Sequence, residues 1–289
     1  MNVTLEDVSV RFPDTLALDT VSLDWSEGRI HGLLGRNGAG KSTLLSLIAA
    51  GRRPTSGTVR VEGQDPWERG MLTERICLVR EGGDLIDEEP ISDTLGMLET
   101  LRPTFDRAYA DDLLESFGLR PKAKLNTLSR GQRSTVGAIV GLATRAPLTL
   151  LDEVHLGMDA PTRQRFYDEL IADYAENPRT YVISSHLIAE LEPIVETVTI
   201  LRAGSLLLQA EADDVRTRGL TLTGPAATVT ELAQGLPVIG SRDLGPTRQL
   251  TLFGELAATD LERARAADVE IGAVPLQDLF IHLTEEDPR

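Results

Sequence analysis

The sequence predicts an α/β fold with a largely parallel sheet, followed by a small segment of mixed strands and helices. Two apolar runs, residues 148–151 and 180–183, are typical of buried parallel strands, and a helical pattern separates them. A glycine-rich stretch at residues 35–40 lies between a third apolar run and another helical pattern. Strand, glycine loop and helix in succession, within an alternation of strands and helices, indicate this class.

The elements follow in order along the first 216 residues. Extended structure is expected from the spacing of Val3, Leu5, Val8 and Val10, from the alternation at 20–25 and from the run 30–34. Helical periodicity follows the glycine loop and recurs at 91–118, broken near Pro103, and at 133–145. Pro161 is expected to open a further helix, and four of its residues should share one face, namely Phe166, Leu170, Ile171 and Tyr174.

A domain boundary is expected near residue 217, which gives domains at 1–216 and 217–289. Beyond it the pattern reads as strand 220–223, helix 226–233, strands 237–241 and 248–253, helix 258–267, strand 269–274 and a last helix through Phe280. This βαββαβ order is the ferredoxin-like arrangement of a small α+β domain. An irregular extension packed on the main domain is the alternative that the short elements leave open.

The composition limits the partners and the compartment. The 289 residues carry a formal net charge of −16, which opposes a nucleic-acid-binding surface and direct binding to anionic lipid. The single cysteine, Cys77, excludes an intrachain disulfide and is expected to be a small buried hydrophobic residue. The N-terminal residues resemble no signal peptide, and no apolar stretch of about 20 residues occurs. We therefore expect a cytoplasmic chain with no nucleic-acid partner and no direct membrane insertion.

A complete phosphate-binding loop pattern follows the third strand. Its residues are Gly35, Arg36, Asn37, Gly38, Ala39, Gly40, Lys41, Ser42 and Thr43. The glycines let successive backbone N–H groups point at phosphate oxygens, and the helix that begins near Lys41 adds its positive dipole end. Lys41 is expected to reach the β- and γ-phosphates, and Ser42 to ligate Mg²⁺. The loop predicts nucleotide binding but does not separate kinases, GTPases and transport ATPases.

A second motif places two carboxylates at the end of the buried strand 148–151. Asp152, at the strand tip, suits the magnesium shell. Glu153 is placed to orient or deprotonate an attacking water and is the candidate general base. A strand that simply ends in two exposed acids would look the same, but the upstream loop favours the catalytic interpretation.

A third motif, Leu128-Ser129-Arg130-Gly131-Gln132, opens a helix shortly before this strand. Here the sequence resembles the ABC ATPase family, whose signature at this place is Leu-Ser-Gly-Gly-Gln. Residues 156–159, which end in Asp159, look like the family's D-loop. The segment 184–186 looks like its switch-histidine segment, and Phe12 stands where an aromatic residue stacks on adenine. The motifs appear in the family's order over roughly residues 1–210.

The resemblance implies ATP and Mg²⁺ as cofactors and a composite site that needs two chains. The signature of one subunit would contact the γ-phosphate held by the Lys41 loop of the other, so the partner is an identical chain or a related ATPase. The residues implied to act across this interface are Ser129, Gly131, Gln132 and Asp159. His186 would hydrogen-bond the γ-phosphate or the attacking water. The family fold implied is a nucleotide-binding domain with an N-terminal β-subdomain and a helical subdomain.

Three positions depart from the family pattern. Arg130 replaces the first signature glycine, and Arg80-Glu81 stands where the family's Q-loop usually has Pro-Gln. Glu81 is still expected to meet Mg²⁺ through a carboxylate oxygen. Val154 replaces the proline that commonly follows the catalytic glutamate, which is expected to change loop stiffness more than chemistry.

These observations predict the ATP-hydrolysing subunit of an ABC transporter that drives a separate transmembrane permease at the inner face of the membrane. Similarity to bacterial export-type ATPases at 54–57, 129–151 and 275–280 favours an exporter. The alternative is an ABC ATPase that acts on a non-membrane assembly. A small-molecule kinase would not account for the signature or for His186. Residues 87–89 are expected to form a solvated acidic turn, with contact to the permease as the alternative.

Overall fold

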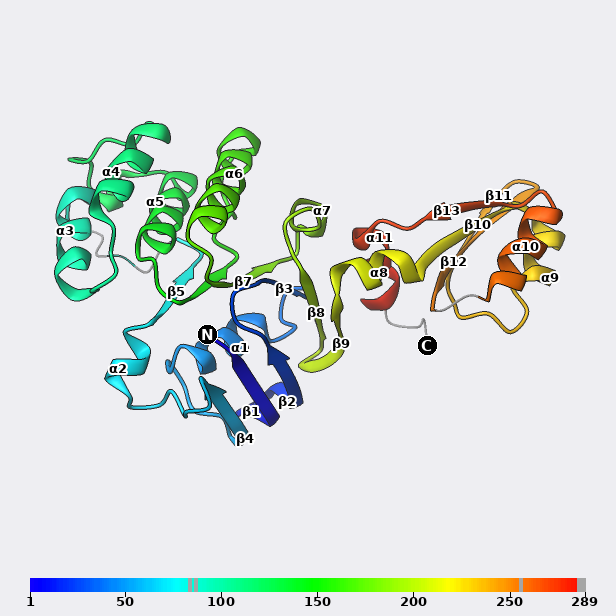
Figure 1. Cartoon of the computed structure of the whole chain (residues 1–289), viewed down its shortest axis with the longest axis horizontal. Coiled ribbons are helices and arrows are strands. Elements are labelled where there is room, and N and C mark those ends of the chain that lie inside the picture. The colour runs from blue at the N-terminus through cyan, green and yellow to red at the C-terminus, as the bar shows by residue number, and fades with distance from the viewer. Residues whose placement is uncertain (83–84, 86–87, 255–256, 285–289) are drawn as a thin grey trace. The chain divides into compact units, whose positions relative to one another are not determined.

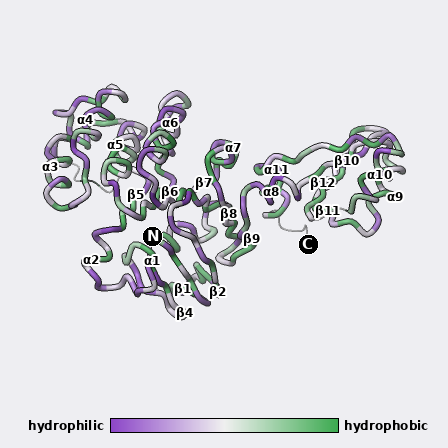
Figure 2. The backbone as a smooth tube through the Cα atoms, in the orientation of Figure 1, coloured by the Kyte–Doolittle hydropathy of each residue, from purple (hydrophilic) through white to green (hydrophobic). Residues whose placement is uncertain are grey.

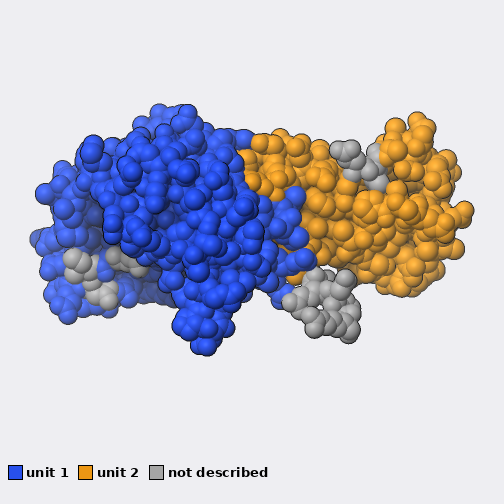
Figure 3. Space-filling view, turned by 90° about the horizontal axis from the view of Figure 1, so that it is seen from below, with its two compact units in different colours: residues 1–186, 201–208 blue, residues 187–200, 209–289 orange. Residues whose placement is uncertain are grey.

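The computed structural model describes residues 1–82, 85, 88–254 and 257–284 of the chain (Figure 1). Asp87 of the expected acidic turn lies outside the described residues. The chain divides into two compact units, shown in separate colours in Figure 3. Unit 1 comprises Met1–His186 and Leu201–Leu208, and unit 2 comprises Leu187–Ile200 and Gln209–Arg289.

A three-stranded antiparallel sheet forms the N-terminal β-subdomain of unit 1. Its order is β2-β1-β4, with β1 at Val3–Phe12, β2 at Thr15–Trp25 and β4 at Ser56–Val61. Alternate residues of β1 are buried, as the spacing of its valines predicts, although the register shifts at irregularities along the pairing with β2. The inward faces join helix α1, Lys41–Ile48, in one hydrophobic core that includes the fully buried Trp25.

A six-stranded sheet carries the two carboxylates of the second motif and the switch-histidine segment at the ends of its strands. Its order is β5-β6-β7-β3-β8-β9, with bounds Ile76–Arg80, Leu148–Asp152, Thr180–Ser185, Ile30–Leu34, Thr197–Arg202 and Ser205–Glu211. Strands β5, β6, β7 and β3 pair in parallel, and every residue of β6 and β7 is buried, as a parallel sheet covered on both faces requires. The register aligns Arg80 with Asp152 and Asp152 with Ser184. The carboxyl ends of three strands therefore meet at one edge.

Unit 1 also contains a series of helices, several of which lie together to one side of this sheet as the helical subdomain (Figure 1). They are α2 at Gly70–Thr73, α3 at Ile91–Leu101, α4 at Arg107–Ser116, a 3₁₀ turn at Leu125–Thr127, α5 at Arg130–Ala143 and α6 at Ala160–Glu176. The C-terminal part of α5 is buried and packs on β5 and β6, where Gly141 leaves room for Leu151 and Val79. Cys77 is buried as predicted, and burial raises the pKa of its thiol.

One expectation for α6 is wrong. Phe166 and Leu170 are buried, but Ile171 is 43% exposed. At about 100° per residue, Ile171 is turned away from the stripe that runs through Phe166 and Leu170. Asp173 continues that stripe instead, and its buried carboxylate is paired with Arg145 and Arg179.

Unit 2 contains the predicted βαββαβ order. Its elements are β10 at Gly219–Pro225, α9 at Ala226–Leu232, β11 at Val238–Leu244, β12 at Thr247–Phe253, α10 at Ala258–Ala266, β13 at Glu270–Ala273 and α11 at Leu276–Thr284. The sheet is antiparallel in the order β11-β12-β10-β13, so the first and third strands of the module are central. Leu222, Leu252, Val229 and Ala264 form its core with residues of α9 and α10. The ferredoxin-like interpretation, rather than an irregular extension, describes this segment.

The compact units divide the chain differently from a single boundary near residue 217. Unit 2 also takes Leu187–Ile200, with α7 at Ile188–Leu191, and α8 at Ala212–Arg218. Glu192, just after α7, accepts a hydrogen bond from the Leu276 N–H (3.3 Å) and is paired with Arg216. These contacts join segments far apart in sequence, so no local change of composition marks them.

Hydrophobic and hydrophilic residues alternate along the helices (Figure 2). Among the residues that the structure describes, no helix has both the length and the apolar character needed to cross a membrane.

Candidate active site

The phosphate-binding loop turns sharply between β3 and α1 because two of its glycines adopt left-handed backbone angles. Gly38 has a φ of 81° and Gly40 a φ of 103°. A Cβ at Gly40 would lie 2.6 Å from the Ala17 carbonyl oxygen, so no larger residue fits there. Lys41 opens α1 at 4% exposure, and its Nζ donates to the Gly35 carbonyl at 2.7 Å. The Lys41 side chain therefore folds back onto the backbone of the loop.

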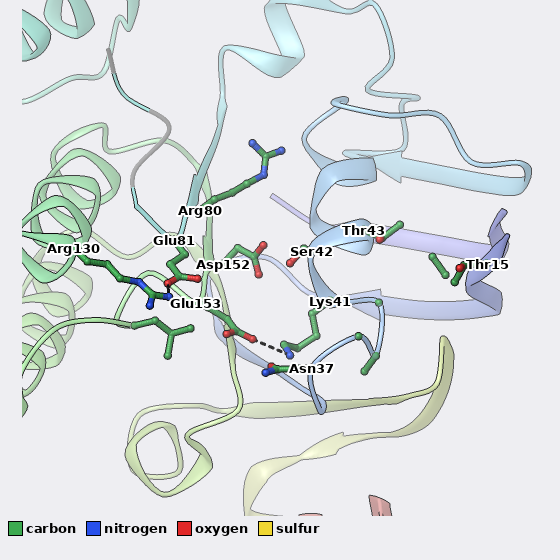
Figure 4. Close-up of a pocket in the computed structure, with 15 residues that line it drawn as sticks. Thr15, Asn37, Lys41, Ser42, Thr43, Arg80, Glu81, Arg130, Asp152 and Glu153 are labelled. Carbon is green, nitrogen blue, oxygen red and sulfur yellow. Dashed lines mark hydrogen bonds and ion pairs between the residues drawn. The ribbon is translucent and has the colours of Figure 1, made fainter. Parts of the chain in front are cut away.

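A cavity of about 640 Å³ lies over this loop and the edge of the sheet (Figure 4). Its lining comes from the loop, from the ends of β5 and β6 and from the start of α5. The lining residues are Thr15, Ala17, Asn37, Gly38, Ala39, Gly40, Lys41, Ser42, Thr43, Arg80, Glu81, Arg130, Asp152, Glu153 and Leu156. The volume suits a nucleotide-sized ligand. The structure therefore places the phosphate-binding loop and the two carboxylates Asp152 and Glu153 in the lining of one cavity.

The candidate base connects the loop to the switch histidine. Glu153 Oε1 lies 2.9 Å from Lys41 Nζ, as the dashed line in Figure 4 marks. The other carboxylate oxygen, Oε2, lies 3.2 Å from His186 Nδ1. Lys41, Glu153 and His186 come from three elements, yet they form one continuous polar chain. The structure thus brings together the three residues for which catalytic roles were predicted.

Ser184 contacts both residues of the second motif. Its hydroxyl donates to Asp152 Oδ1 at 2.6 Å and accepts from the Glu153 N–H at 3.0 Å. Glu153 has a φ of 51°, a left-handed conformation that costs a non-glycine residue free energy and that its neighbours must stabilise. The Ser184 contacts supply that support and direct the Glu153 side chain into the cavity. Ser184 belongs to the predicted switch-histidine segment, but the sequence assigned no role to its hydroxyl.

The signature residues build the N-terminus of α5. Ser129 Oγ accepts from the Gln132 N–H at 3.3 Å, and Gln132 Oε1 accepts from the Ser129 N–H at 3.0 Å, which completes a capping box. Gly131 is required by packing, since a Cβ there would lie 2.3 Å from the Gly157 carbonyl oxygen. Asp159 caps α6 by accepting from Thr162 N–H at 3.0 Å, and its hydrogen bonds to Thr162 lower the pKa of its carboxyl. Of these residues, none lines the described cavity in the single chain.

Glu81 and Phe12, two residues with predicted roles at the site, each contact an arginine side chain in the structure. Glu81 does line the cavity, but its carboxylate is paired with the guanidinium of Arg130 rather than directed at Ser42 (Figure 4). Phe12 is not among the residues that line the described cavity, and the Arg52 guanidinium lies 4.2 Å from the centre of its ring. Thr15 and Ala17, on the next strand, do line the cavity. Both arginine contacts join residues that are distant in sequence.

His155 is a buried residue beside the site that the sequence motifs did not reveal. Its Nε2 lies 2.9 Å from Ser185 Oγ, next to His186, and its ring lies against Tyr167 of α6. Its Nδ1 has no hydrogen-bond partner among the described residues. Burial lowers the pKa of His155 from 6.5 to about 4, because the charged imidazolium is poorly solvated there. A neutral His155 therefore links the turn after Glu153 to the segment that carries His186.

Comparison with known proteins decides the family. The family described as ABC transporter matches residues 18–155. The methionine import ATP-binding protein MetN of Rhizobium johnstonii is 30% identical, with 99% of this chain and 86% of the relative covered. The chain belongs to the family of ABC transporter ATP-binding proteins. This ABC ATPase is also similar to daunorubicin resistance ATP-binding protein DrrA3 of Streptomyces coeruleorubidus, at 28% identity over 99% of this chain and 97% of the relative.

Solved structures confirm the predicted ABC-type nucleotide-binding fold. The ATP-binding subunit of an ABC transporter has a TM-score of 0.67 at 22% identity, covering 75% of this chain and 92% of the other. A dimeric ATP-binding cassette in a post-hydrolysis state with ADP and Pi has a TM-score of 0.65 at 24% identity, covering 73% and 98%. As a member of the family, the ABC ATPase binds and hydrolyses ATP. Members of the family form dimers and work with a transmembrane permease.

Proposed function

We propose that the cavity over the loop is the phosphate half of the ATP site and that the predicted site residues keep their roles there. Lys41 binds the β- and γ-phosphates, and the loop N–H groups from Gly35 to Thr43 surround them. Glu153 accepts the proton of the attacking water. His186, which lies 3.2 Å from the Glu153 carboxylate, hydrogen-bonds the γ-phosphate or the attacking water. The observation that supports these roles is the continuous Lys41–Glu153–His186 chain. Phe12 remains our candidate for adenine stacking, which requires Arg52 to leave its ring.

The residues present also fit Mg²⁺. Ser42 offers a hydroxyl and Asp152 a carboxylate, and both line the same cavity. Such oxygen ligands suit this ion, which proteins usually hold through one or two carboxylates together with substrate phosphates. Bound there, Mg²⁺ would neutralise charge on the β- and γ-phosphates. Glu81 would join Ser42 and Asp152 only after leaving Arg130.

We further propose that the complete site forms between two chains. The capping box gives α5 a well-ordered N-terminus, where the first N–H groups and the helix dipole favour a phosphate. Ser129, Gly131, Gln132 and Asp159 do not line the described cavity of their own chain, so they are available for the site of a partner. The partner is a second copy or a related ABC ATPase.

At the level of the whole assembly, we propose that the pair of ATPases drives a separate permease in export, at the inner face of the cell membrane. The similarity to the daunorubicin resistance ATP-binding protein supports export, since it extends over 97% of that relative. Import is the second candidate, supported by the 30% identity to the methionine import ATP-binding protein. Residues 217–289 form an accessory domain in either case, in keeping with their separate antiparallel sheet and core.

The test is affinity purification of tagged Glu153→Gln protein with ATP from detergent-solubilised native cells. Recovery of one polytopic membrane protein supports the transporter proposal and identifies the permease. Recovery of the tagged chain alone, or of a non-membrane assembly, contradicts it. The direction is then measured with the purified pair in vesicles whose ATPase side faces outward: ATP-dependent uptake into the lumen supports export, and ATP-dependent release supports import.

A further inference from the structure

The two charged departures from the family pattern meet in the structure. Glu81 follows β5 and Arg130 begins α5, and the Glu81 carboxylate is ion-paired with the Arg130 guanidinium. The family pattern has uncharged residues, glutamine and glycine, at these two places. The negative charge in the Q-loop is thus matched by a positive charge in the signature of the same chain. The pair lies on the wall of the cavity that holds Lys41 and Glu153 (Figure 4).

The backbone of Arg130 packs closely against neighbouring backbone, whereas its side chain is mostly exposed to solvent. Arg130 follows the capped Ser129, and the adjacent Gly131 packs against the Gly157 carbonyl too closely to admit a Cβ. The aliphatic stem of Arg130 lies over Gly157, with Cγ 3.1 Å from the position of a Cβ built there. The stem of Arg130 therefore connects the signature to the D-loop, and its guanidinium connects the signature to the Q-loop residue Glu81.

The ion pair between Glu81 and Arg130 is weak enough for a phosphate group to replace the Glu81 carboxylate as the partner of Arg130. The Arg130 side chain is 70% exposed and that of Glu81 is 36% exposed. An ion pair this open to water contributes little and is screened by salt, shifting an equilibrium by about fivefold at most. A triphosphate carries more negative charge than one carboxylate, and guanidinium groups bind phosphate well. A nucleotide brought to the signature would compete successfully for Arg130.

We propose that Glu81 and Arg130 form a latch that ATP-driven dimerisation opens. In one chain Arg130 holds Glu81; in the closed pair Arg130 turns to the phosphates bound by the partner, and Glu81 is released into its own cavity. Arg130 is thereby a positioning residue for Glu81. This inference rests on the proposed two-chain site, because a partner's nucleotide is the competitor that opens the latch.

The test is a double-mutant cycle in the Glu153→Gln background, in which the ATP-dependent dimerisation constant is measured by analytical ultracentrifugation. Glu81→Gln frees Arg130, so dimerisation should tighten by about two- to fivefold at low salt. In a chain that also carries Arg130→Gly, Glu81→Gln should have no such effect. Raising the ionic strength from about 0.05 M to about 0.5 M should reduce the gain, because the latch is exposed.

Asp111→Asn is the matched control. It removes the same charge from another exposed arginine–carboxylate pair, in which Asp111 on α4 accepts from Arg107 Nε at 3.0 and 3.1 Å, outside the cavity. It should leave dimerisation unchanged, which separates the latch from a general effect of net charge. ATP affinity of the single chain, measured at protein concentrations below dimerisation, verifies that each variant is folded.

The outcomes distinguish the latch from the two-chain site. If the Glu153→Gln parent fails to dimerise with ATP, the proposed two-chain site is refuted, and the latch with it. If the parent dimerises but Glu81→Gln has the same effect with Arg130 as with Gly at that position, only the latch is refuted. Weaker dimerisation of Glu81→Gln in the presence of Arg130 also refutes it.

Discussion

Acidification should destabilise unit 1 through His155. This imidazole is fully buried, and burial lowers its pKa from 6.5 to about 4 in the folded chain. Between these two values the unfolded chain binds a proton that the folded chain excludes, so stability falls as the pH falls. The contribution is fully present above pH 6.5 and is lost progressively as the pH approaches the lower value.

The size of the effect follows from the shift. A difference of about 2.5 pKa units corresponds to about 3 kcal/mol over the whole transition. Between about pH 7.5 and about pH 5 the loss from this residue is about 2 kcal/mol, because the transition is then only partly complete. A loss of this size is a large fraction of the stability of a typical domain.

The measurement is urea unfolding of the wild-type chain and of His155→Gln, followed by tryptophan fluorescence at several pH values. Both tryptophans, Trp25 and Trp67, belong to unit 1, so the signal reports the unit that contains His155. Glutamine does not titrate and retains an amide for the Ser185 hydroxyl. Any loss of stability that His155→Gln causes equally at every pH cancels when the pH dependences of the two proteins are compared. The titration of carboxylates present in both proteins cancels as well.

The wild type should lose about 2 kcal/mol more than His155→Gln between about pH 7.5 and about pH 5. Parallel curves for the two proteins would refute the reasoning, since they would show that His155 titrates alike in the folded and unfolded chains. His282→Gln, in unit 2, is the control and should follow the wild-type curve.

The remaining predictions concern the ATP site. Glu153→Gln should lower ATP turnover by about 100-fold or more while leaving ATP bound, because the carboxylate that accepts the proton is gone; turnover at the wild-type rate would exclude Glu153 as the base. Lys41→Ala should weaken ATP binding by about 100-fold in a calorimetric titration, since charge-assisted contacts to phosphate are lost, and retained affinity would contradict the loop assignment. Ser129→Arg should leave ATP affinity of the single chain within about twofold, although α5 loses a cap worth about 1 kcal/mol. The same variant should not dimerise with ATP, and dimerisation by ultracentrifugation would contradict the two-chain site.

Features with local causes could be predicted from the order of the residues alone. The phosphate-binding loop needs its glycines within a few residues, and the Ser129–Gln132 capping box spans one helical turn. The strand that ends in Asp152 and Glu153 is recognisable from its continuous apolar run. The βαββαβ order of unit 2 also follows from short-range periodicity, and the structure confirms it.

Only the tertiary structure decided which distant side chains meet. The pairing of Glu81 with Arg130, the cover of Arg52 over Phe12 and the contact of His155 with Ser185 each join segments 30 or more residues apart. Local propensity carries no information about such contacts, because they depend on sheet register and on how helices pack over the sheet. The register that aligns β5, β6 and β7 places Glu81, Asp152 and Ser184 at one edge. Because these strands are neighbours in the sheet, motifs that are separate in the sequence form one site. His155 is buried beside that site.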